Sequence, residues 1–96
     1  MVKWITVLVV DPEKAPEVRE LPNNLKAFEL TIQGYIMTVE SIRPGCLIFY
    51  DGNYPLTDKP IKRADIKGTF IIIRVDNSEP VSLTEVDINI LAEVYK

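Results

Sequence analysis

Aromatic and basic residues gather between positions 50 and 63, and their side chains could together hold a nucleotide. They are Tyr50, Tyr54, Lys59, Lys62 and Arg63. A tyrosine ring can stack on a base, while lysine offers a point charge and arginine a forked donor to the phosphate. The same residues could instead contact a protein partner, since loops on rigid scaffolds often carry binding residues. The structural alternative is that the cations pair with acidic residues or stay solvated, and that the tyrosine rings are buried.

Charge is unevenly distributed along the C-terminal third of the chain. Residues 59–74 contain five basic residues and one acidic residue, whereas residues 75–96 contain five acidic residues and one basic residue. The formal net charge of the whole chain is −3. An acidic chain with one small basic segment argues against a general nucleic-acid binder, and direct DNA binding is not expected.

The sequence lacks most of the residue types from which catalytic sites are built. It has no histidine and a single cysteine, Cys46, which excludes Cys/His zinc sites, internal disulfides and Ser-His-Asp triads. None of its acidic pairs has the spacing and apolar setting of a general acid and base, and it has no glycine-rich phosphate loop. We therefore predict no catalytic residue, no metal ligand and no cofactor. A small enzyme with a carboxylate-bound metal is the alternative.

The elements that would position these residues are strands and two helices. With 96 residues, 47% of them hydrophobic, the chain predicts a single α+β domain over 1–96. Segments 3–10 and 67–76 are apolar on both faces, which is typical of strands covered on two sides. Residues 16–21 alternate apolar and charged side chains and predict an edge strand. Two further strands are expected at 35–40 and 46–50, and a loop at 54–65.

Local signals mark both helices. Asn23 or Asn24 can cap a helix that begins near Leu25, and Gly34 lies where its C-terminus would need a left-handed residue. A capping box from Ser82 to Glu85 predicts the start of the second helix. The apolar side chains expected on one face of that helix are Leu83, Val86, Ile90, Leu91 and Val94.

The predicted order is β-β-α-β-β-loop-β-α, with a single, mostly antiparallel sheet of four to five strands. Two arrangements would cover both apolar faces of these strands. If both helices cover one face, the other face is apolar and would be closed by a homodimer, which is the arrangement we expect. The alternative is one helix on each face. The apolar runs are too short to span a membrane and nothing requires an oxidising compartment, so a cytoplasmic location is expected.

Four short segments, in order along the chain, resemble a known family. They are Leu-Val-Val-Asp-Pro-Glu-Lys-Ala-Pro-Glu-Val at 8–18, Gly-Tyr-Ile at 34–36, Arg-Ala-Asp-Ile-Lys-Gly-Thr-Phe-Ile-Ile at 63–72 and Ser-Leu-Thr at 82–84. They are similar to domain-of-unknown-function family 3846, a group of short phage, plasmid and bacterial proteins. The chain departs from the family at Lys62, where members commonly have asparagine, and at Gln33, where they often have a second glycine.

The resemblance implies a mobile-element context and no mechanism, because the activity of the family is unknown. Small accessory proteins of mobile elements often bind a host protein or sequester a nucleotide signal. We therefore expect a non-enzymatic accessory protein of a phage or mobile element that binds a protein partner, with a nucleotide-binding module as the alternative. The binding surface is expected to include residues 53–63. Within it, Arg63 is the family-matching residue that folding explains least.

Overall fold

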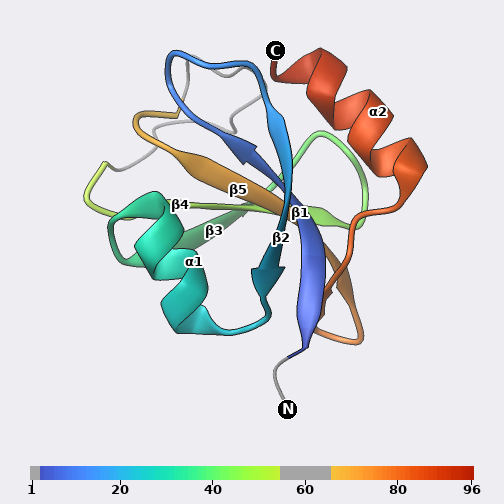
Figure 1. The fold of residues 1–96 in the computed structure, drawn as a ribbon, viewed down its shortest axis with the longest axis horizontal. Helices are drawn as coiled ribbons and strands as arrows, with labels where there is room; N and C mark the ends of the chain where they lie inside the picture. Colours follow the sequence, from blue (N-terminus) through green and yellow to red (C-terminus); the bar gives the residue numbers. More distant parts are fainter. Residues whose placement is uncertain (1–2, 55–65) are drawn as a thin grey trace.

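The computed structural model describes residues 3–54 and 66–96 of the chain. Its elements are β1 (Trp4–Val10), β2 (Glu17–Pro22), α1 (Leu25–Ile32), β3 (Ile36–Glu40), β4 (Cys46–Asp51), β5 (Phe70–Asp76), β6 (Glu79–Val81) and α2 (Glu85–Val94). All strand pairs are antiparallel and belong to one sheet of six strands (Figure 1). The predicted α+β class with two helices is confirmed.

The sheet has one strand more than the four to five expected from the sequence. The additional strand, β6, pairs with β5 where only a turn was expected. Asn77 and Ser78, which join the two strands, both have positive φ, 51° and 64°. Two central residues with positive φ form the tight turn that suits an antiparallel hairpin. The chain therefore folds straight back along β5 before α2 begins.

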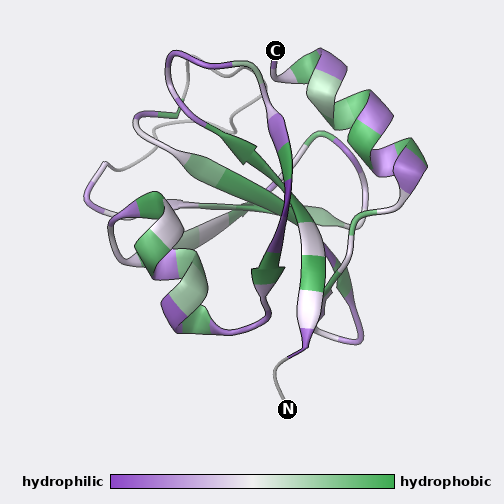
Figure 2. Ribbon diagram, in the orientation of Figure 1, coloured by the Kyte–Doolittle hydropathy of each residue, from purple (hydrophilic) through white to green (hydrophobic). Residues whose placement is uncertain are grey.

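The three apolar strands occupy the middle of the sheet, in the order β2-β1-β5-β4-β3. Leu8 of β1 and Ile48 of β4 both lie opposite Ile72 of β5, so their side chains share one face. Figure 2 shows hydrophobic residues along these central strands and more polar residues in the turns and at the edges. The prediction of two-sided apolar strands at 3–10 and 67–76 is confirmed by a core on each face.

Each face of the sheet is covered by its own helix. The core under α2 comprises Leu8, Val10, Cys46, Ile48, Tyr50, Ile66, Phe70, Ile72, Leu83, Leu91 and Tyr95. The core under α1 comprises Ile5, Val7, Val9, Phe28, Ile32, Phe49, Ile71 and Ile73. Alternate residues of β1 and β5 enter opposite cores, which places the helices on opposite sides of the sheet. The expectation that both helices share one face was wrong, and an open apolar face is no longer a reason to expect a homodimer.

Helix α1 begins as predicted and ends differently. The Oδ1 atom of Asn24 accepts a hydrogen bond of 2.8 Å from the N–H of Ala27, the expected cap. The left-handed residue at the other end is Gln33, with φ 59° and ψ 46°, and not Gly34. Gly34 serves a different need, because a Cβ there would overlap the carboxylate of Asp51. A glycine at position 33 would adopt this left-handed conformation without steric cost.

The predicted capping box would make Ser82 the N-cap of the second helix, but α2 is capped two residues later. Thr84 is the N-cap, and its box partner is Asp87. Ser82 instead accepts a 2.9 Å hydrogen bond from the N–H of Thr6. The buried side of α2 therefore differs from the predicted face: Val86 and Ile90 are 56% and 38% exposed, whereas Asp87 is fully buried.

Candidate functional site

The residues proposed from the sequence divide into one buried, one exposed and three outside the described part of the chain. Tyr50, on β4, is 8% exposed and belongs to the core under α2. Its ring is therefore not a free stacking platform, as the nucleotide hypothesis had required. Tyr54, four residues further on, is 48% exposed. The residues outside the described ranges are Lys59, Lys62 and Arg63.

The turn that carries Tyr54 is held by the carboxylate of Asp51. Its Oδ1 atom accepts hydrogen bonds from the N–H and the side-chain amide of Asn53, each 2.9 Å long. The N–H of Tyr54 then donates to the Asp51 carbonyl at 3.1 Å. Asp51 is itself nearly buried, against Gly34. These bonds fix the backbone from which the Tyr54 side chain projects.

Two further exposed side chains lie beside this turn, on β3 and just before it. The Tyr35 ring and the Met37 side chain occupy the space directly over Gly52, where a Cβ could not be accommodated. The Tyr35 hydroxyl also donates a 2.8 Å hydrogen bond to the Gly52 carbonyl. Tyr35 is 50% exposed and Met37 46% exposed. We call Tyr35, Met37 and Tyr54 the turn surface.

Two of the three residues of the turn surface, Tyr35 and Met37, were not predicted from the sequence. Tyr35 and Gly52 are 17 positions apart, and the pairing of β3 with β4 brings them together. The predicted strand at 35–40 already indicated that Tyr35 and Met37 share one face of the sheet, because they are two positions apart in a strand. Only the register of the hairpin places that face over the 51–54 turn.

A cluster of charged side chains joins α2 to the sheet, and within it Arg74 of the basic segment pairs with the acidic last helix, as the structural alternative allowed. Arg74 of β5 donates from Nε to Oδ2 of Asp87 at 2.7 Å and from Nη2 to Oδ1 at 2.6 Å. Arg43, in the turn between β3 and β4, donates from Nε to Oδ1 at 2.8 Å. The N–H of Thr84 donates to Oδ2 at 2.9 Å. We call Arg43, Arg74 and Asp87 the ionic cluster.

The electrostatics of the ionic cluster are those of a buried ion pair with a structural role. The hydrogen bonds from Arg74 hold the pKa of Asp87 well below its ordinary value, in opposition to the effect of burial, and Arg43 and Thr84 act in the same direction. The bond to Asp87 in turn raises the pKa of Arg74. Because its pKa is lowered and its oxygens already accept hydrogen bonds from Arg43, Arg74 and Thr84, the Asp87 carboxylate is a weak proton acceptor and a poor candidate for a general base. Its two arginine partners connect α2 to β5 and to the β3–β4 turn.

Cys46 lies beside this cluster, and its thiol has low nucleophilic reactivity. It is 2% exposed, as expected for a buried hydrophobe. Burial, together with the negative charge of Asp87, raises the pKa of its thiol to about 11. The thiolate is the reactive form of cysteine, so a thiol with this pKa is a poor nucleophile at neutral pH.

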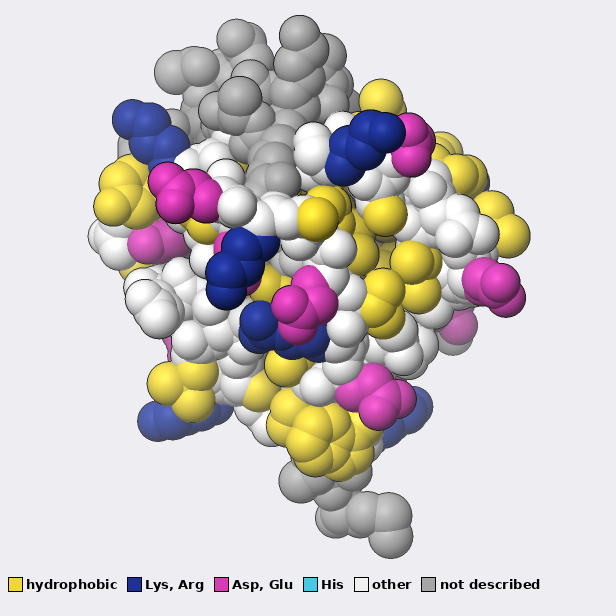
Figure 3. All heavy atoms as spheres, turned by 45° about the horizontal axis from the view of Figure 1, so that its top comes forward, with side chains coloured by type: hydrophobic (Ala, Val, Ile, Leu, Met, Phe, Trp, Pro, Cys, Tyr) yellow, Lys and Arg dark blue, Asp and Glu magenta, His cyan; other side chains and the backbone are white. Residues whose placement is uncertain are grey.

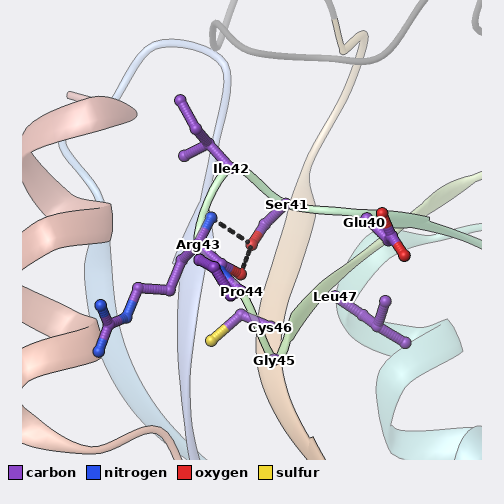
Figure 4. A pocket seen from close by; sticks show the side chains of 8 residues that line it. All are labelled: Glu40, Ser41, Ile42, Arg43, Pro44, Gly45, Cys46 and Leu47. Carbon is purple, nitrogen blue, oxygen red and sulfur yellow. Dashed lines mark hydrogen bonds between the residues drawn. The ribbon is translucent and has the colours of Figure 1, made fainter.

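The β3–β4 turn encloses a hollow of about 390 Å³ lined by residues 40–47 (Figure 4). The side chain of Arg43 points away from it toward α2, and the Ser41 hydroxyl is engaged with the Arg43 backbone. The hollow therefore presents neither an unengaged cation nor an activated nucleophile. Within residues 3–54 and 66–96, no group of three or more acidic, cysteine or histidine side chains could hold a metal ion. No helix in the same ranges is long and apolar enough to cross a membrane.

A six-stranded antiparallel sheet with a helix on each face defines the chain as a small α+β domain protein. The chain belongs to the family described as "Domain of unknown function (DUF3846)", whose sequence pattern matches residues 5–96. The resemblance found in the sequence is thereby confirmed. No curated protein and no solved structure is significantly similar to the chain.

Proposed function

We propose that this chain is a non-enzymatic accessory protein of a phage or mobile element and that it binds a protein partner through the turn surface. The observation that carries the proposal is the grouping of Tyr35, Met37 and Tyr54, each about half exposed, around one turn. Tyrosine and methionine are enriched at protein interfaces, where their side chains fill pockets of the partner.

The turn surface is held rigid in the free protein, which favours binding. The bond from the Tyr35 hydroxyl to Gly52 and the bonds from Asn53 to Asp51 fix the backbone beneath it. A surface that is already ordered loses less conformational entropy when a partner docks. Tyr54 also adjoins the segment that contains Arg63, so the proposal keeps that arginine as part of the contact.

The described residues offer the nucleotide-binding alternative less support. That hypothesis proposed Tyr50 and Tyr54 as the rings that stack on a base. Tyr50 is buried in the core, so of these two only Tyr54 is exposed beside the basic segment. On the face drawn in Figure 3, the lysine and arginine side chains of the described residues are interspersed with acidic ones; Lys59, Lys62 and Arg63 lie outside the described residues. A phosphate-rich ligand would favour a concentrated positive surface.

The test begins with the tagged chain as bait in a lysate of the cells in which the gene occurs. A captured protein is purified, and its affinity for the wild-type chain is measured by calorimetry. Tyr54→Ala, Met37→Ser and Arg63→Glu are each expected to weaken that affinity by about tenfold or more, since interface anchors typically contribute over 1 kcal/mol.

The matched control is Val86→Ser, which removes an equally exposed apolar side chain from α2. It should leave the affinity unchanged. Wild-type affinity in all three variants would contradict the proposed binding site. A rise in melting temperature with a nucleotide, in a panel tested without any protein partner, would favour the alternative.

A further inference from the structure

Strand β3 lies at one end of the sheet and, among the described residues, pairs with β4 on one side only. The N–H of Ser41 bonds to the carbonyl of Cys46, and the N–H of Gly52 bonds to the carbonyl of Tyr35. In an antiparallel pair such bonds alternate, so residues 35, 37, 39 and 41 face β4. The backbone groups of Ile36 and Thr38 must therefore point outward. Among residues 3–54 and 66–96, neither has a backbone partner on that side.

The two ends of the sheet are protected very differently. Strand β2, at the opposite end, carries Glu17, Arg19 and Glu20 and finishes at Pro22. Charged side chains and prolines are the usual means by which an edge strand avoids pairing with another chain. Strand β3 reads Ile-Met-Thr-Val-Glu, without proline and without a basic residue. Of the two end strands in the described part of the chain, β3 is therefore the one better suited to pair with a further strand.

From this pattern we propose that β3 pairs antiparallel with β3 of a second copy, around a twofold axis at Thr38. In that register Thr38 lies opposite Thr38 of the second copy, and threonine pairs are favourable across strands. Met37 then lies opposite Val39, and both are apolar. Every outward-facing residue of one strand meets an outward-facing residue of the other.

The position of the single charge on β3 selects this register. With the axis at Thr38, Glu40 lies opposite Ile36 of the second copy. An axis two residues later would place Glu40 opposite its own copy, which is unfavourable for like charges. An axis two residues earlier would leave the end of the strand unpaired. The inference depends on the backbone edge of β3 and shares only Met37 with the turn surface. The substitutions that test it are therefore placed at Thr38, which is not part of the turn surface.

The experiment exploits the fact that a twofold axis brings residue 38 against itself. The dissociation constant for self-association of the full chain is measured by analytical ultracentrifugation across a dilution series. Thr38→Lys alone and Thr38→Glu alone place like charges opposite one another and should each weaken self-association about fivefold. An equimolar mixture of the two variants should recover wild-type association, because opposite charges then meet.

Backbone amide exchange supplies a second readout that does not depend on any variant. The amides of Ile36 and Thr38 should become more protected as the wild-type chain is concentrated. The amide of Val39 faces β4 and should be protected at every concentration. A wild-type chain that is monomeric throughout would overturn the proposal. So would a dimer in which both charged variants associate normally or the Ile36 and Thr38 amides stay unprotected.

Discussion

At the scale of single residues, Asp87 shows how a charged side chain can organise a small core. Its carboxylate has no exposed surface and is bound by two guanidinium groups, each still 27% exposed in its side chain. A buried charge is tolerated only when it is paired and hydrogen-bonded, and removal of one partner leaves the others uncompensated. Asp87 should therefore matter more for stability than any surface acid.

We predict that Asp87→Asn lowers the free energy of unfolding by about 3 kcal/mol at pH 7. This is the low end for a broken buried ion pair, because both arginines retain contact with water. Chemical denaturation in urea measures the change. The matched control is Glu93→Gln in the same helix, which removes an exposed pair with Lys96 and should cost under about 1 kcal/mol. Equal losses in the two variants would contradict the structural role of the cluster.

The same residue predicts a pH dependence with a defined sign. The pKa of Asp87 is lowered in the folded chain, while in the unfolded chain it should be about 3.9. Below about pH 4 the unfolded state binds a proton that the folded state does not, so stability falls as the pH decreases. Thermal unfolding between neutral and acidic pH should show this loss. The Asp87→Asn variant should lose less stability over the same interval.

At the scale of elements, the rotation of α2 about its axis is the feature that distinguishes the structure from the sequence prediction. The apolar pattern had placed Ile90 and Leu91 on the same buried face. Leu91 is fully buried, whereas Ile90 is 38% exposed. The ionic cluster turns Asp87 inward, and residues four apart on a helix share a face, so Leu91 follows it.

Neighbouring substitutions in α2 test this rotation. Leu91→Ala should lower the free energy of unfolding by about 3 kcal/mol, because it leaves a cavity under the helix. Ile90→Ala should change it by about 0.5 kcal/mol, as expected for a surface position. Urea titrations of both variants give the comparison. Similar losses at the two positions would mean that the helix is rotated toward the face that the sequence predicted.

At the scale of the whole molecule, one sheet supplies the surface for two separate cores. Strands β1, β4 and β5 contribute residues to both, so neither helix can leave without exposing the middle of the sheet. Cys46 lies within one of these cores and is the only cysteine in the chain. It is therefore a natural reporter of how the whole fold opens.

We predict that the Cys46 thiol reacts with a disulfide reagent only when the structure opens. Labelling of the native chain should be slower than labelling of the urea-unfolded chain by more than about a hundredfold. The control places a cysteine on the surface, as Glu13→Cys combined with Cys46→Ala, and should label promptly in the folded state. Prompt labelling of Cys46 in the native chain would mean that the core under α2 opens readily.

Much of the fold could be predicted because its signals are local. The β-branched residues of 3–10 and 67–76 favour strands wherever they occur, and apolar character on both of their faces requires cover on both. The cap at Asn24 involves residues three positions apart. The tight turn at residues 51–53 was likewise predicted from neighbouring residues, whereas the exposure of Tyr54 was left open. These features depend on chemistry within a few positions, which the sequence states directly.

The sequence by itself thus determined the class of fold, its principal strands and the start of the first helix. Only the tertiary structure decided which helix covers which face, because one helix per face and two on one face satisfy the same apolar pattern. It also decided that Asp87 is buried, since its partner Arg43 lies 44 residues away. Tyr35 and Met37 join Tyr54 only through the register of β3 with β4. Each of these outcomes depends on contacts between distant segments, which form only when the chain packs.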